Sequence, residues 1–163
     1  MTDNRAIVCF GDSITFMAAS RADRGYPPIL DEALFEDGYT VGNHAAGGSG
    51  FQSARDAYDA YYRNRGLWGA CLLTGVNDLA AGTSANTIFA GINAFVSRML
   101  SDGLCVVVST VLPWKDGGGW TRAIQSTTES LNSKILGLRG TNSCLRVVDG
   151  YTELAAKRVL TAA

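Results

Sequence analysis

Short apolar runs alternate with longer stretches of helical periodicity along this chain. The run from Leu104 to Thr110 is almost continuously apolar and β-branched, which is typical of a strand that is covered on both faces. Similar runs recur before and after it. The pattern predicts five strands, at Ala6–Phe10, Tyr39–Asn43, Ala70–Thr74, Leu104–Thr110 and Leu145–Val148.

The stretches between these runs predict helices. The clearest apolar stripes run over Ile88–Leu100 and Ile124–Leu138. Helices are also predicted over Tyr26–Phe35, Ala54–Tyr62 and Tyr151–Leu160, the first of them because its Pro-Pro pair suits an opening helical turn. Alternation of strand and helix with right-handed crossovers predicts an α/β fold with three α/β/α layers around a five-stranded parallel sheet.

In sheets of this kind the functional site lies beyond the carboxyl ends of the strands. That rule selects four segments, which are Gly11–Thr15, His44–Gly50, Gly75–Asp78 and Val111–Gly119. The chemistry of the protein is therefore expected in these segments.

The first of them has the form of a nucleophile turn. Gly11 permits a tight turn after the strand, and the N–H groups at the start of a following helix can hold a developing negative charge. Ser13 then stands where a nucleophile would be presented. Serine is also favoured as a simple helix cap, so both interpretations of Ser13 remain open on these residues alone.

Composition narrows the function classes. With 163 residues, 47% hydrophobic and 18% charged, the chain is predicted to form one soluble domain with a substantial core. A net charge of −1 at pH 7 gives no basis for binding nucleic acid or an anionic membrane. No apolar run reaches the ~18 residues of a membrane span. Residues 1–5 run straight into the first strand, so no signal peptide is expected there, while a cleaved leader in a longer precursor stays open.

The cysteines indicate neither disulfides nor a metal site. Cys9, Cys71, Cys105 and Cys144 lie in or beside predicted strands, without a Cys-x-x-Cys pair and with a single histidine in the chain. We expect buried free thiols that pack as small apolar groups. Free thiols favour a reducing compartment such as the cytoplasm. No metal or organic cofactor is expected.

Three strand-end segments resemble motifs of the GDSL/SGNH hydrolase family. In chain order they are Gly11-Asp12-Ser13, Asn43-His44-Ala45-Ala46-Gly47-Gly48 and Gly75-Val76-Asn77-Asp78. Each motif is weak alone, but three of them at the expected strand ends make a specific signal. The resemblance covers residues 6 to about 114 and implies one SGNH-hydrolase-like domain over residues 1–163, with the flavodoxin-like sheet order 2-1-3-4-5.

The resemblance also implies roles for individual residues. Ser13 would be the nucleophile, and its own N–H, the N–H of Gly48 and the side chain of Asn77 would form the oxyanion hole, with Gly47 as the nearest alternative to Gly48. The implied function is an esterase or deacylase that acts on a small-molecule or carbohydrate ester through an acyl-enzyme. Backbone and amide N–H donors suit that chemistry because acyl transfer creates an oxyanion.

Further substrate-pocket candidates are Asp12, His44 and Trp114. An aspartate at the position of Asp12 more typically orders the turn through backbone hydrogen bonds than acts as a base. His44 is the only histidine in the chain and stands beside the implied oxyanion glycine, where a packing or hydrogen-bonding role is more typical than that of a base.

The expected base is missing from the motifs. Members of the family carry a late Asp-x-x-His element, whose histidine accepts the serine proton. Asp149 follows the fifth predicted strand and is interpreted as a capping residue. We therefore expect the domain to lack its Asp-x-x-His loop and last helix, through truncation or cleavage, so that a C-terminal segment or second chain completes the site. The alternative is a catalytically inactive carbohydrate- or ligand-binding domain on the same scaffold.

Overall fold

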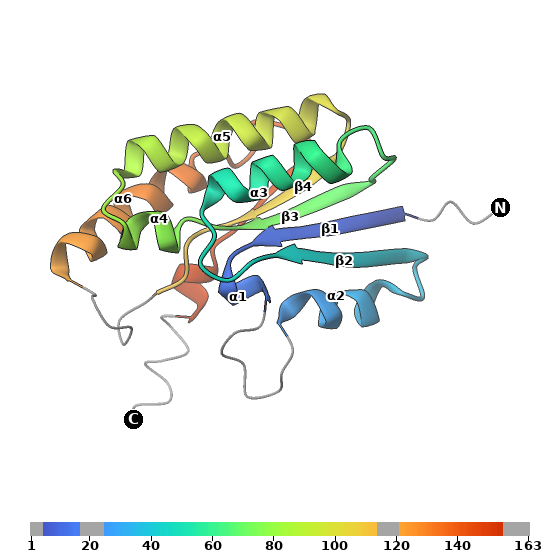
Figure 1. Cartoon of the computed structure of the whole chain (residues 1–163), viewed down its shortest axis with the longest axis horizontal. Coiled ribbons are helices and arrows are strands. Elements are labelled where there is room, and N and C mark those ends of the chain that lie inside the picture. The colour runs from blue at the N-terminus through green and yellow to red at the C-terminus, as the bar shows by residue number, and fades with distance from the viewer. Residues whose placement is uncertain (1–4, 17–24, 114–120, 155–163) are drawn as a thin grey trace.

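The computed structural model describes residues 5–16, 25–113 and 121–154 (Figure 1). Five strands form one parallel sheet in the order β2-β1-β3-β4-β5. Their bounds are β1 Arg5–Gly11, β2 Tyr39–Ala45, β3 Gly69–Leu73, β4 Cys105–Ser109 and β5 Leu145–Val148. The predicted strands and sheet order are confirmed, and the largest difference is at β2, which ends at Ala45 instead of Asn43.

Helices lie on both faces of this sheet (Figure 1). One face carries α3 (Phe51–Ala57), the π-helical η1 (Tyr58–Tyr62), α4 (Val76–Ala80), α5 (Ala85–Ser101) and α6 (Arg122–Leu136). The other carries α2 (Tyr26–Leu34), which packs against β2. The short α1 (Ser13–Phe16) follows β1, and a further helix begins at residues 150–154. The predicted α/β/α layering is therefore confirmed.

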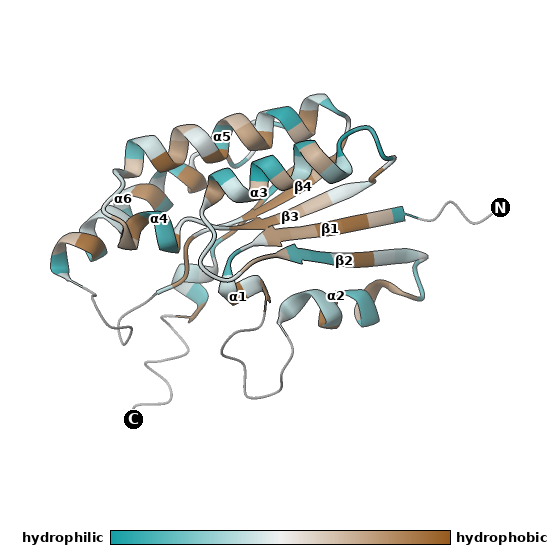
Figure 2. Cartoon of the chain, in the orientation of Figure 1, coloured by the Kyte–Doolittle hydropathy of each residue, from teal (hydrophilic) through white to brown (hydrophobic). Residues whose placement is uncertain are grey.

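The two faces of the sheet differ in burial. On β4, Val106 and Val108 point into the α5 side and are 0% and 1% exposed, whereas Cys105, Val107 and Ser109 on the other face are only half-buried. In Figure 2, hydrophobic positions are prominent on β1 and β3, whereas much of β2 is hydrophilic or neutral. Among the described residues, the Val107 face of β4 is less buried than the α5 face, and the main contacts of α2 are with β2.

The cysteines are all free, but only one of them is buried. Cys9 is fully buried on β1 and stands opposite Cys71 on β3. The Cys9 thiol donates a hydrogen bond to Cys71, and this bond and burial both raise the pKa of Cys9. Cys144 is exposed, so the prediction of a buried thiol is wrong there. That residue precedes β5 at the sheet margin, where little packs over it.

Asp149 closes β5 as a capping residue. Its Oδ1 accepts hydrogen bonds from the backbone N–H of Thr152, at 3.1 Å, and from the hydroxyl of Thr110, at 3.4 Å. The first of these bonds satisfies an N–H group in the opening turn of the helix that begins at residue 150. The capping role predicted for Asp149 is confirmed.

Candidate active site

Ser13 is the first residue of α1 and directly follows the turn that ends β1. The turn needs glycine at position 11, because a Cβ there would overlap the Thr15 hydroxyl and the Leu73 carbonyl oxygen. Asp12 Oδ1 accepts a hydrogen bond from the Ile14 N–H at 2.9 Å and so caps α1. The half-buried Ser13 is therefore not needed as the cap. Its hydroxyl takes part in none of the hydrogen bonds among the described residues.

Asp12 lies beneath this turn and not on an open surface. Asp12 is only 1% exposed. Burial, and then the charge of Asp78, raise the pKa of the Asp12 carboxyl, while the Ile14 N–H opposes the shift. This geometry fits the interpretation that Asp12 orders the nucleophile turn.

A glycine-rich segment after β2, residues 46–50, approaches the same turn; we call it the glycine loop. The Ala46 N–H donates to the Gly11 carbonyl at 3.2 Å, and the Ser49 N–H donates to the Ala46 carbonyl at 3.2 Å. Gly48 has a φ of 74°, whereas Gly47 is not among the positive-φ glycines. This is the pattern of a type II turn with Gly48 at the position that requires a left-handed backbone.

The third segment, after β3, meets the glycine loop through Asn77. Gly75 adopts a φ of 116° and caps the short α4, on which Asn77 stands. The Asn77 side-chain amide donates from Nδ2 to the Ser49 carbonyl at 2.9 Å. A primary amide has a second N–H, which this bond leaves available. The loops that follow β1, β2 and β3 are thus joined by hydrogen bonds at the carboxyl edge of three neighbouring strands.

Comparison with known proteins shows the family of the chain. The model of the GDSL-like lipase/acylhydrolase family matches residues 9–159. The chain belongs to this family. The resemblance deduced from three short motifs is therefore confirmed. A search of curated proteins finds no match to the chain.

Solved structures of GDSL proteins share the fold. A member from Veillonella parvula DSM 2008 has a TM-score of 0.78 at 19% identity, covering 96% of this chain and 83% of its own. A G-D-S-L family protein from Desulfitobacterium hafniense DCB-2 has a TM-score of 0.74 at 19% identity, covering 90% and 77%. A variant of the esterase AlinE4 has a TM-score of 0.75 at 16% identity, covering 95% and 80%.

His44, the remaining candidate among the described residues of the GDSL chain, is engaged away from the Ser13 turn. His44 stands on β2 opposite Phe10, and its Nδ1 lies 3.0 Å from the Tyr62 hydroxyl. Its ring is 5.1 Å from the Tyr62 ring and 5.5 Å from the Tyr61 ring. His44 is thus engaged in an aromatic cluster. Trp114 lies outside the described residues, as does most of the fourth strand-end segment, Val111–Gly119.

Two residues of this GDSL site had no predicted role in it. The Ser49 hydroxyl lies 2.9 Å from the Gly11 carbonyl oxygen and 2.8 Å from that of Ala46. Asp78 lies within α4, and its Oδ2 accepts a hydrogen bond from the Phe51 N–H at 3.1 Å. No signal in the sequence pointed to this contact, since α3 was predicted to begin at Ala54 and begins after Gly50 in the structure.

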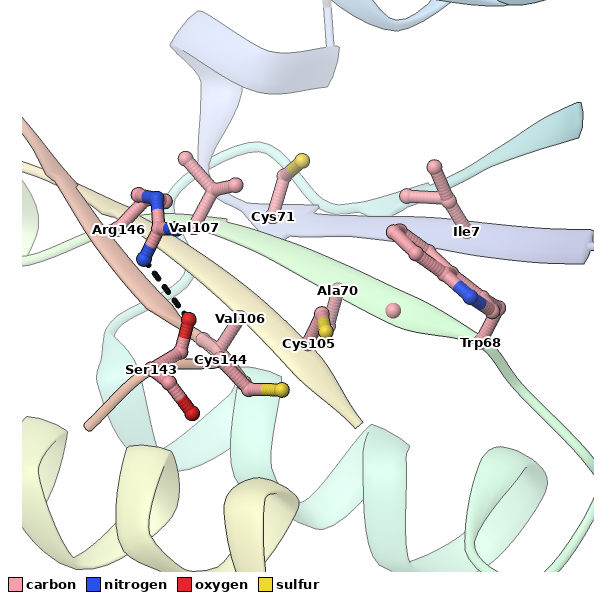
Figure 3. Close-up of a pocket in the computed structure, with 11 residues that line it drawn as sticks. Ile7, Trp68, Ala70, Cys71, Cys105, Val106, Val107, Ser143, Cys144 and Arg146 are labelled. Atoms are coloured by element: carbon pink, nitrogen blue, oxygen red, sulfur yellow. Dashed lines mark hydrogen bonds between the residues drawn. The ribbon is translucent and has the colours of Figure 1, made fainter. Parts of the chain in front are cut away.

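Two cavities lie away from the GDSL motifs. One, of about 210 Å³, opens near the amino ends of β3 and β4 and is lined by residues that include Trp68, Cys105 and Cys144 (Figure 3). The other, of about 460 Å³, lies between α2 and the sheet, beside Tyr26 and Cys71. Ser13, Gly48 and Asn77 line neither cavity. The three motif segments therefore lie at the carboxyl ends of the strands, away from the first cavity.

In the described parts of the chain, no group of three or more His, Cys, Asp or Glu residues is placed to hold a metal ion. In the same residues, no helix is both long and apolar enough to cross a bilayer.

Proposed function

We propose that this GDSL-family chain is a serine hydrolase that cleaves carboxylic esters, as an esterase or deacylase, with Ser13 as nucleophile. The observation that supports it best is the joining of the Ser13 turn, the glycine loop and Asn77 through Gly11 and Ser49. Gly47 and Gly48 are exposed, which leaves this edge open to a small-molecule or carbohydrate ester.

In the proposed reaction, Ser13 Oγ attacks the ester carbonyl carbon and the carbonyl oxygen gains a negative charge. The N–H groups of Ser13 and Gly48 and the second N–H of Asn77 hold that charge. The alcohol leaves with a proton, and water then releases the acid from the acyl-enzyme. Donors that are already oriented contribute about 3–4 kcal/mol each to transition-state stabilisation when judged by removal. The bond from Asn77 to the Ser49 carbonyl supports such orientation, since it fixes the plane of the amide.

The general base is proposed to come from elsewhere. His44 is the only histidine in the sequence, and Tyr62 and the neighbouring rings already engage it. A serine hydroxyl is a weak nucleophile without a base beside it. We propose that a histidine outside these 163 residues, in a further segment or a second chain, accepts the Ser13 proton. The engagement of the single histidine also supports one alternative function, that of an inactive carbohydrate- or ligand-binding domain on this scaffold.

A fluorophosphonate probe tests the proposal, because it labels an activated serine covalently. The chain alone and a longer chain that contains an Asp-x-x-His element are each incubated with the probe, and the labelled residue is found by peptide mass spectrometry. Labelling of Ser13, much faster in the longer chain, is the expected result. Ser13→Ala should abolish it, while Ser133→Ala, at an exposed position on α6, should not. No labelling of Ser13 in either chain would favour the binding domain.

A further inference from the structure

The glycine loop is held by hydrogen bonds and not by side-chain packing. Gly47 and Gly48 are exposed, and a Cβ built at either position meets no atom within 4 Å. Glycine loses more conformational freedom on folding than any other residue, so an unpacked pair of glycines does not keep one backbone conformation by itself. If Gly48 is to present its N–H to an oxyanion, something must fix both ends of this loop.

One end is fixed at β1. The Gly11 carbonyl accepts the Ala46 N–H at 3.2 Å and lies 2.9 Å from the Ser49 hydroxyl. The loop therefore begins in hydrogen-bond contact with the residue that starts the Ser13 turn.

The other end is fixed by a residue of a different loop. Helix α3 begins after Gly50, which has no side chain to cap it, and the first turn of α3 contains no acidic residue. The free N–H groups of that turn need an acceptor and favour a negative charge. Asp78 on α4 supplies both, because its Oδ2 accepts the Phe51 N–H at 3.1 Å.

The approach of Asp78 is close enough to restrict the residues around it. A Cβ at Gly50 would lie 2.8 Å from Asp78 Oδ2 and closer still to Oδ1. While the Phe51 N–H bonds to Asp78, the Phe51 ring packs on Gly91 of α5. The packing is so tight that a Cβ at Gly91 would overlap the ring. Phe51 is thus held between α4 and α5, directly after the glycine loop.

We propose that Asp78 is a positioning residue, which caps α3 from the neighbouring loop and thereby holds Gly48 in the conformation that binds the oxyanion. The proposal rests on the proposed esterase function and deepens it. Asp78 does not contact the reacting atoms in this role. It acts through Phe51 and Gly50, while the adjacent Asn77 holds Ser49 at 2.9 Å.

The test compares Asp78→Ala and Asp78→Asn with a matched control, Asp31→Ala. Asp31 is also half-buried and accepts a backbone N–H, that of Val41 at 2.7 Å, but it joins α2 to β2. Hydrogen–deuterium exchange of residues 46–51 reports the order of the glycine loop without any need for catalysis. The rate of fluorophosphonate labelling, in a chain that carries the base, reports the oxyanion hole.

Asp78→Ala should speed exchange in residues 46–51 about tenfold, the size expected from losing a helix cap. It should lower the labelling rate at saturating probe by about 10- to 100-fold, with the half-saturating probe concentration within about threefold, as expected for an interaction made in the transition state. Asp78→Asn keeps an acceptor oxygen and should recover most of both losses. Asp31→Ala should change neither measurement.

A second variant keeps the test decisive if Asp78→Ala fails to fold. Gly50→Ala retains every polar group but displaces the Asp78 carboxylate, and it should reproduce both losses. Exchange as slow in Asp78→Ala or Gly50→Ala as in Asp31→Ala would overturn the positioning role. Absence of Ser13 labelling in the longer chain without substitutions, which carries the base, would instead contradict the proposed function. The exchange result would still decide the role of Asp78.

Discussion

The carboxyl edge of the sheet and its α5 face are stabilised in opposite ways. On the α5 face, Phe95 is 0% exposed, and its ring centroid lies 5.9 Å from that of Phe10 and 5.6 Å from that of Tyr58. At the edge, Gly47 and Gly48 meet no side chain, and backbone and polar groups hold the loops together. Because apolar burial fixes one region and hydrogen bonds fix the other, mutations should separate stability from catalysis.

The largest expected effect is on the packed face. Phe95→Ala should lower the free energy of unfolding by about 3–5 kcal/mol, because it removes a fully buried ring and leaves a cavity. Urea unfolding measures the loss, and Ser13 labelling of the folded fraction should stay within about threefold of the unmodified rate. A loss below about 1 kcal/mol would show that this face is not the main source of stability.

At the edge the expected effect falls on catalysis. Asn77→Ala should reduce the rate of Ser13 labelling, or of ester hydrolysis, by about 10²- to 10³-fold, as removal of one oxyanion donor does. The free energy of unfolding should fall by only about 1 kcal/mol, from the lost bond to Ser49. Asn86→Ala, at an exposed position on α5, is the matched control. An unchanged rate in Asn77→Ala would remove this residue from the oxyanion hole.

Neighbouring valines on β4 sharpen the contrast between the two faces. Val106→Ala removes methyl groups from the fully buried side and should cost about 2 kcal/mol of unfolding free energy, whereas Val107→Ala on the half-buried side should cost less than about 1 kcal/mol. Both variants lose the same two methyl groups relative to the parent chain, so only the burial of the position differs. Equal losses in urea unfolding would indicate that both faces are covered in solution.

Asp12 is a buried ionisable residue, so its contribution to the free energy of unfolding should depend on pH. Burial, and next the charge of Asp78, raise its pKa in the folded chain above the unfolded value. Between those two pKa values the folded state holds the proton more tightly, so stability falls as pH rises through this window. Asp12→Asn keeps an acceptor for Ile14 without the charge. Its unfolding free energy relative to the parent should therefore rise with pH through the window, measured by urea unfolding from about pH 3 to pH 8. A flat difference would contradict the prediction.

The smallest effect is expected at His44. His44→Gln removes the contact with the Tyr62 hydroxyl and should cost about 1 kcal/mol of unfolding free energy. The rate of Ser13 labelling should change by less than about threefold, because the ring is engaged in the aromatic cluster. A fall of about 100-fold or more would identify His44 as the base and contradict the proposal of an external histidine.

The strands were predictable because they are apolar, β-branched runs whose ends are marked by glycine and polar residues. A helix was expected after the Ser13 turn, but the extent of α1 and the presence of α4 were not predicted, since four or five residues are too few to show a helical period. The motifs at the strand ends pointed to Ser13, Gly48 and Asn77, whose loops do meet. The bond between Asp78 and Phe51 was beyond sequence reasoning, because it depends on how two loops 27 residues apart pack together.

Because Asp78 follows Phe51 by 27 residues, the contact between them forms late during synthesis of the chain. Ser13, β2 and the glycine loop all precede Asp78 in the chain. A nascent chain whose Asp78 has not yet left the ribosome carries Ser13 and Gly48, but not the carboxylate that accepts the Phe51 N–H at the start of α3. On the proposed role of Asp78, the glycine loop becomes ordered only after β3 and α4 have been synthesised, so the proposed site would assemble after its nucleophile has emerged.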